Sequence, residues 1–328
     1  MKYFVQTWMI VAVLAAPAFG ALPKEQVAAD AKWLLHFDVA QFRSSRVGGY
    51  IVREILQKKL SRPLTDLKGQ FKFDVDPDKI LDKVSSITIY GTDYQSPEDN
   101  SVLLIRVDPD IERAFVGVLA GMSLAGSNAP VRVDQTQMGD ITFSVVQDKV
   151  FIAVLPGKVV AVGKSRAMTE QAAKVLQGKA ANLKSSKAFS DFPEIRKAFF
   201  FLGVAEGFSA DTELPPQARL LQLADGGRVV LGEDADQVFV SMGLRAKSSE
   251  VVTQMQQVIQ GVIAMGSLGQ PDDKDLAQLV QSVKVTADKN VVNVSVEYPV
   301  EKVIQRLGEQ KANADSKKHA REAEAGKD

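Results

Sequence analysis

The chain contains no cysteine and only two histidines among its 328 residues. The absence of cysteine excludes disulfide bonds, thiolate metal ligands, thiol catalysis and iron–sulfur clusters. It also leaves no residue that could carry the lipid of a bacterial lipoprotein. The fold must therefore be stabilised by packed cores rather than by covalent cross-links, and we expect no cofactor.

The chain also lacks a net charge, because 40 Lys and Arg residues balance 40 Asp and Glu residues. Proteins that bind nucleic acids neutralise phosphates with a basic surface or stripe. The sequence contains no such stripe. We therefore expect no nucleic-acid partner.

A long apolar run is found only at the N-terminus. Lys2 gives a positive start, residues 4–16 are mainly apolar, and a proline and small residues follow up to Gly20. This order is typical of a signal peptide, and the run is shorter than the roughly 20 residues that a membrane helix needs. We expect residues 1–20 to be removed near Gly20/Ala21, which places the protein outside the cytoplasm, periplasmic or secreted, with no integral membrane segment after cleavage.

The remaining chain repeats one pattern of predicted elements: strand, helix, strand pair, helix, strand pair, helix. Clusters of Gly, Pro, Asp and Asn separate the strands, as tight reversals require. The pattern predicts an α+β protein of two tandem copies, residues 21–180 and 181–308, each a mainly antiparallel sheet with helices on one face, ferredoxin-like or related. The strands of the predicted pairs are residues 84–92, 101–107, 141–146, 150–155 and 159–162 in the first copy, and 228–231, 237–244, 283–286 and 291–296 in the second.

Two helices are predicted from apolar residues spaced three and four apart. One covers residues 111–122, and the other carries a single apolar stripe in the second copy. Its methionines are most simply core residues. The members of this stripe are Val251, Met255, Val258, Val262 and Met265.

Each copy is expected to finish on a helix that a glycine ends. The first covers residues 166–177 before Gly178, and the second covers residues 300–307 before Gly308. Residues 309–328 are nearly all charged or small. Such a composition cannot offset the entropy of ordering, so we expect a disordered tail.

A group of polar residues on the first strand is a candidate binding site. Strand alternation places His36 and Asp38 on one face, with Cα atoms roughly 6.5–7 Å apart. Tyr90 and Arg106 would join them if the neighbouring strands paired in a suitable register. Such a group on an open sheet face could bind a small anion or transfer protons. The alternative is an incidental histidine on a half-exposed strand.

Asp74, Asp76 and Asp78 are candidate metal ligands, because carboxylates at alternate positions are typical of calcium loops. The EF-hand pattern then needs a glycine where Lys79 stands and a glutamate where Ser85 stands. The alternative is a helix cap and turn around these residues.

Two other motifs lack the residues that their chemistry requires. Gly163-Lys164-Ser165 is not preceded by the correctly spaced glycine of a phosphate-binding loop. The sequence around Ser123 resembles the nucleophile elbow of serine hydrolases. A serine triad also needs a histidine base, and the elbow belongs between a strand and the following helix, whereas Ser123 lies at the end of a predicted helix. These failures favour a protein without catalytic activity.

Segments of the first copy resemble uncharacterised secreted bacterial proteins of a family of unknown function. The Trp33 strand with Asp38, residues 44–51 and residues 85–91 carry the resemblance. These motifs are structural and imply no catalytic residue.

The sequence therefore favours a non-catalytic extracytoplasmic protein. It would bind a protein or an envelope component through a sheet face or through the groove between its copies. The alternative is a carboxylate- or metal-dependent hydrolase that uses acidic residues such as Asp38 and the three aspartates above.

Overall fold

The structure is a computed structural model that describes nine parts of the chain. The predicted signal peptide, the predicted helix 111–122 and the three aspartates at 74, 76 and 78 lie outside them. The described parts are residues 22–56, 82–108, 133–155, 159–190, 192, 195, 198–207, 223–269 and 274–325.

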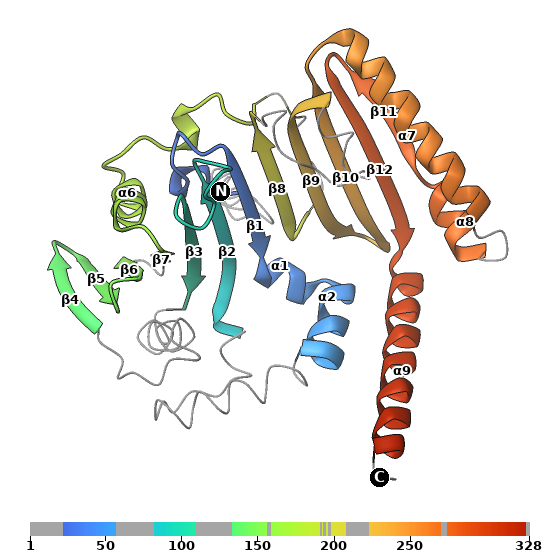
Figure 1. Ribbon diagram of the computed structural model, residues 1–328, viewed down its shortest axis with the longest axis horizontal. Coiled ribbons are helices and arrows are strands. Elements are labelled where there is room, and N and C mark those ends of the chain that lie inside the picture. The colour runs from blue at the N-terminus through green and yellow to red at the C-terminus, as the bar shows by residue number, and fades with distance from the viewer. Residues whose placement is uncertain are drawn as a thin grey trace, which may run out of the picture.

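Twelve strands form one sheet in which all neighbours are antiparallel, in the order β11-β12-β10-β9-β8-β1-β2-β3-β7-β6-β5-β4 (Figure 1). The predicted α+β class with a mainly antiparallel sheet is confirmed. The ferredoxin-like arrangement is not. The strands are β1 (Trp33–Asp38), β2 (Val84–Gly91), β3 (Ser101–Val107), β4 (Val133–Met138), β5 (Ile141–Val146), β6 (Val150–Leu155), β7 (Val159–Gly163), β8 (Phe201–Glu206), β9 (Ala224–Asp234), β10 (Gln237–Ala246), β11 (Lys284–Asp288) and β12 (Val291–Pro299).

The described helices are mostly short. The longest are α7, which follows β10, and α9, which follows β12. The helices are η1 (Lys24–Gln26), α1 (Val39–Ser44), α2 (Arg46–Ile51), η2 (Val52–Leu56), α6 (Arg166–Leu176), η4 (Leu183–Ser185), α7 (Ser249–Gly269), α8 (Lys274–Gln281) and α9 (Val300–Ala325).

The two faces of the sheet can be followed from strand to strand, because directly paired residues project from the same face. His36 is paired with Thr88 and with Leu202, whereas the next residue along, Leu35, is paired with Ile89 and Gly203. We call the face that carries His36 the α6 face and the face that carries Leu35 the α7 face.

Within residues 21–180 helices pack on both faces, so the prediction that each copy has its helices on one face is wrong. Val39 of α1 packs with Ile105 and Val160 on the α7 face, whereas α6 packs on the α6 face. On the α6 face, the row from His36 continues to Ala161 of β7, which packs in one apolar cluster with Ala172 of α6. On the α7 face, the row from Leu35 continues to Met242 of β10, which packs against the cluster that contains Met255 of α7. The periodicity of a strand does not specify on which face of the sheet the next helix packs.

The long helix α7 buries a stripe that agrees only in part with the predicted one, since Met255 is buried and Val251 packs against the same cluster. Met255 is fully buried, together with Val252 and Ile259. The expectation that Met265 is a core residue is wrong, since 66% of its surface is exposed. Three members of the predicted stripe are therefore on the outside of the helix. They are Val258, Val262 and Met265, with exposures of 47%, 58% and 66%.

The helix α9 extends beyond its predicted end. It runs through Gly308 to Ala325, so the expected stop at Gly308 is wrong and residues 309–325 are helical. Lys311 Nζ lies 2.7 Å from Glu54 Oε2 of η2, which ties the C-terminal helix to the short helices after β1. No helix in the described parts of the chain is long and apolar enough to span a membrane.

We predict that Met255→Ala lowers the free energy of unfolding by about 2–5 kcal/mol, because it leaves a cavity between α7 and the sheet. Gln254→Ala, at an exposed position of the same helix, should change it by less than about 0.5 kcal/mol. Urea unfolding of both variants measures the difference. Equal values would contradict the packing of α7 described above.

Candidate functional site

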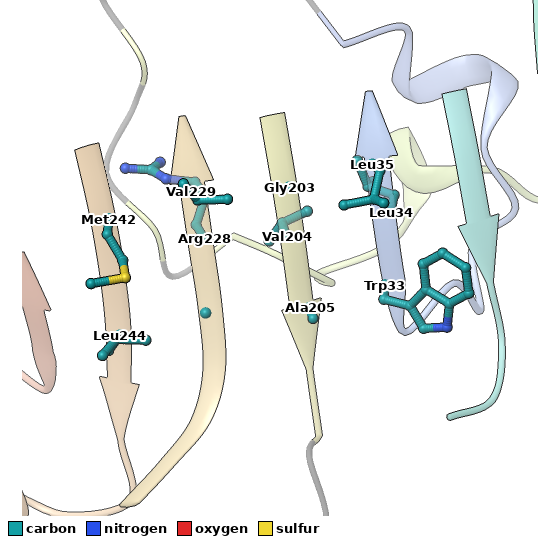
Figure 2. A pocket seen from close by; sticks show the side chains of 11 residues that line it. Trp33, Leu34, Leu35, Gly203, Val204, Ala205, Arg228, Val229, Met242 and Leu244 are labelled. Atoms are coloured by element: carbon teal, nitrogen blue, oxygen red, sulfur yellow. The ribbon is translucent and has the colours of Figure 1, made fainter. Parts of the chain in front are cut away.

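A shallow hollow of about 300 Å³ lies on the α7 face where β1, β8, β9 and β10 run side by side (Figure 2). Two rows of directly paired residues form it, and the rows lie two positions apart along the strands. The rows are Trp33, Ala205, Gly227 and Leu244, and Leu35, Gly203, Val229 and Met242.

The hollow exists because small residues stand in the middle of both rows. Gly203, Ala205 and Gly227 add little or nothing above the backbone. Figure 2 shows the larger side chains flanking them, on β10 on one side and on β1 on the other. A Cβ atom at Gly203 would lie 3.0 Å from Val229 Cγ1 and 3.2 Å from Leu35 Cδ2, so larger side chains there would have to displace their neighbours.

Trp33 is held in place at the edge of the hollow. Its Nε1 donates a hydrogen bond to the Asp93 carbonyl oxygen at 2.9 Å. Its ring lies over Gly91, where an added Cβ would come within 2.4 Å of Trp33 Cζ2. Glycine is therefore required at this position. The indole is directed from β1 toward β2, so Trp33 borders the hollow at its β1 edge with its polar atom already satisfied.

The hollow is suited to an apolar group and not to acid–base chemistry. All side chains that its two rows direct to this face are apolar or absent. Arg228 also borders the hollow, but alternation along β9 places its side chain on the α6 face. Leu35 is 43% exposed, so the site is open to solvent. It can shelter an apolar group whose polar end stays in water.

The four binding candidates predicted from the sequence all lie on the α6 face, opposite to this hollow. Tyr90 is paired with Leu34, and Arg106 is paired with Ser86, which is paired with Asp38. The neighbouring strands therefore bring the four side chains to one face. Anion binding by this group stays a prediction.

The surroundings of these candidates are largely closed. His36 is 2% exposed, and its Nδ1 shares a 2.8 Å hydrogen bond with Thr88 Oγ1. Tyr90 is 1% exposed, and burial raises the pKa of its hydroxyl. Asp38 Oδ1 accepts a 2.8 Å hydrogen bond from the Gln41 backbone N–H, which caps α1. These contacts give three of the four candidates a role in the fold.

Burial lowers the pKa of His36 below its ordinary value of 6.5, because a charged imidazolium would lose its hydration. The Asp38 carboxylate acts in the opposite direction and raises this pKa, and the Arg106 guanidinium lowers it. The histidine is therefore neutral at pH 7.

The predicted metal ligands Asp74, Asp76 and Asp78 lie outside the described residues. Among the residues that are described, no three His, Asp or Glu side chains lie close enough together to hold a metal ion.

Sequence reasoning missed the hollow, although one of its signals was present. Alternation along the first strand places Trp33 and Leu35 together on the face opposite to His36. The second signal was the small residues Gly203, Ala205 and Gly227. Their significance depends on the pairing of β1 with β8, which no local pattern specifies.

No protein-family model matches the sequence, and neither does any curated protein. The fold is similar to those of two crystal forms of a protein named TP0453. Form III has a TM-score of 0.47 and 11% identity, and the match covers 87% of this chain and 97% of that one. Form I has a TM-score of 0.45 and 12% identity, with 87% and 96% covered. Similarity at this level carries no information about a ligand or an activity.

We predict that His36 makes the protein less stable in mild acid. Its pKa is lower in the folded state than in the unfolded state, so the unfolded chain binds the proton more readily. The free energy of unfolding should therefore fall as the pH drops below about 6.5 and should not depend on His36 well above that value.

Urea unfolding at about pH 7.5 and about pH 5.5 tests this prediction. The fall in stability between the two values should be smaller in His36→Gln than in the wild type. His319→Gln removes the only other histidine and serves as the control. An unchanged fall in His36→Gln would show that protonation of His36 is not linked to unfolding.

Proposed function

We propose that this protein is an exported, non-catalytic binding protein that takes an apolar ligand into the hollow on its α7 face. The observation that carries the proposal is the pair of residue rows that place only apolar side chains around about 300 Å³ of open space. Ligand sites in proteins begin at about this volume and are mostly lined by apolar side chains. Burial of apolar surface would supply the binding free energy.

The ligand class follows from the shape and exposure of the site. The hollow is open on the side of Leu35, which is 43% exposed, so a bound molecule need not be enclosed. An acyl chain or another apolar part of an envelope component can enter while its polar end remains in solvent. A fully polar ligand would find no hydrogen-bonding side chain among the residues that the two rows direct to this face.

Export is part of the proposal and rests on residues 1–20. Their charged start, apolar run and small-residue end favour cleavage near Gly20/Ala21. A periplasmic or secreted protein would meet envelope components directly. N-terminal sequencing of the protein recovered from its host tests this part: a chain that begins at Ala21 is expected, and an uncleaved chain would contradict export.

We also propose that the chain consists of two tandem copies whose junction forms the site. The strand neighbours β1-β2-β3-β7-β6 and β8-β9-β10-β12-β11 follow the same order, which supports the proposal. The copies would meet at the β1–β8 pair, and the hollow extends over this pair on the α7 face. This arrangement agrees with binding at the junction between the copies.

A hydrolase that uses Asp38, Asp74, Asp76 and Asp78 is the alternative, and no observation on the described residues favours it. A calcium-dependent hydrolase can be tested simply, because an ion that binds only the folded state must raise the melting temperature. An increase in Tm with added calcium would support the alternative over the apolar-ligand proposal.

We predict that decanoate binds in the hollow and shifts the emission of Trp33 to shorter wavelength. The sequence holds two tryptophans, Trp8 and Trp33, so a protein that starts at Ala21 retains only the one that lines the hollow. Titration of tryptophan fluorescence measures the affinity directly. Saturable binding is expected.

Ala205→Leu should weaken decanoate binding by about tenfold or more, because its side chain fills the space between Trp33 and Gly227 and removes roughly 1.4 kcal/mol or more of binding free energy. Thr136→Leu adds a similar side chain at an exposed position of β4 and should leave the affinity unchanged. Equal affinities for the wild type and Ala205→Leu would contradict the proposed site.

A further inference from the structure

The strand β11 leaves one edge of the sheet unpaired. It is the last strand in the sheet order, and among the described residues only β12 pairs with it. Four of its five residues are exposed. Figure 1 shows it at the margin of the sheet, next to α7. An unpaired edge presents backbone N–H and C=O groups that can pair with another strand.

The charges of β11 are complementary to the charges of a second, reversed copy of the same strand. The strand reads Lys284, Val285, Thr286, Ala287, Asp288. Antiparallel pairing of two copies about Thr286 places Lys284 of each copy opposite Asp288 of the other. Val285 belongs to the α7-face row, because it is paired with Val294, which is paired with Met242. Lys284 and Asp288 lie at odd distances from Val285, so both project from the α6 face. Both are exposed, and neither forms an ion pair within the described part of the chain.

The other edge of the sheet does not have this property. Reversal of β4 onto itself about its centre places Asp134 opposite Gln137 and Gln135 opposite Thr136. No pair of opposite charges results. The complementarity is therefore specific to β11 and is not a general feature of the sheet edges.

The exposed stripe of α7 lies close to the same edge. The helix packs against β11, β12 and β10 on the α7 face. A two-fold axis that pairs two β11 strands would bring two α7 helices side by side on that face. Val258, Val262 and Met265 give these helices apolar surface that solvent otherwise covers, with exposures of 47%, 58% and 66%.

We propose that a second copy of this chain binds at β11, through antiparallel pairing of the two β11 strands about a two-fold axis. The same patch serves both subunits, so the contact closes at a dimer and leaves no free β11 edge. Two Lys284–Asp288 pairs set the register of the strands. The two α7 helices add apolar contact beneath them. The proposal does not depend on what the hollow binds.

Sedimentation equilibrium of the mature chain and three charge variants tests the dimer. Lys284→Asp places Asp opposite Asp288, and Asp288→Lys places Lys opposite Lys284, so each single variant replaces two attractive pairs with two repulsive ones. Each should weaken dimerisation by about tenfold or more. The double variant, Lys284→Asp with Asp288→Lys, restores opposite charges and should restore the dimer.

Matched controls separate this interface from others. Asp148→Lys reverses a charge in the β5–β6 turn and should dimerise as the wild type does. Val262→Ser should weaken the dimer without affecting the fold, which far-ultraviolet circular dichroism checks.

A monomeric wild type, a dimer insensitive to the single reversals, or a double variant that remains as weak as the single ones would each overturn the proposal. Normal dimerisation of Ala205→Leu would show that the two proposals are independent.

Discussion

The antiparallel pairing of β1 with β8 is the interaction on which the rest of the structure depends. It joins strands that are more than 160 positions apart in the sequence and makes one sheet of what would otherwise be two. Five residue pairs, from Trp33 with Ala205 to Phe37 with Phe201, form the ladder. The cost in chain entropy of closing such a long loop grows only slowly with its length, so packing on both faces can offset it.

The same pairing determines what each face of the central sheet can do. On the α6 face it brings Leu34 and His36 beside Val204 and Leu202, and all four are buried. A histidine in that position is held neutral and serves the fold. On the α7 face it brings large residues of one strand beside small residues of the next. The hollow is thus a consequence of side-chain size along a long-range ladder.

Local patterns predicted the elements well and their assembly poorly. The predicted bounds of β3, β5 and β6 agree with the structure, because alternating apolar residues and turn signals are local properties. The end of α9 was wrong because helix propensity continues past Gly308. The outward direction of Met265 could not be predicted, since α7 carries two apolar stripes and only the sheet position selects one. His36 was placed on the correct face relative to its neighbours, but its burial depends on the chain that covers it.

Hydrogen exchange along β1 and β8 measures the central claim most directly. If the two strands pair within one sheet, their backbone amides should exchange only when the protein opens globally, as slowly as those of β2 and β9. Similar protection across all four strands is the predicted result. Rapid exchange of the β1 and β8 amides, with protection retained in β2 and β9, would show two separate sheets and would contradict this account of the fold and of the hollow that depends on it.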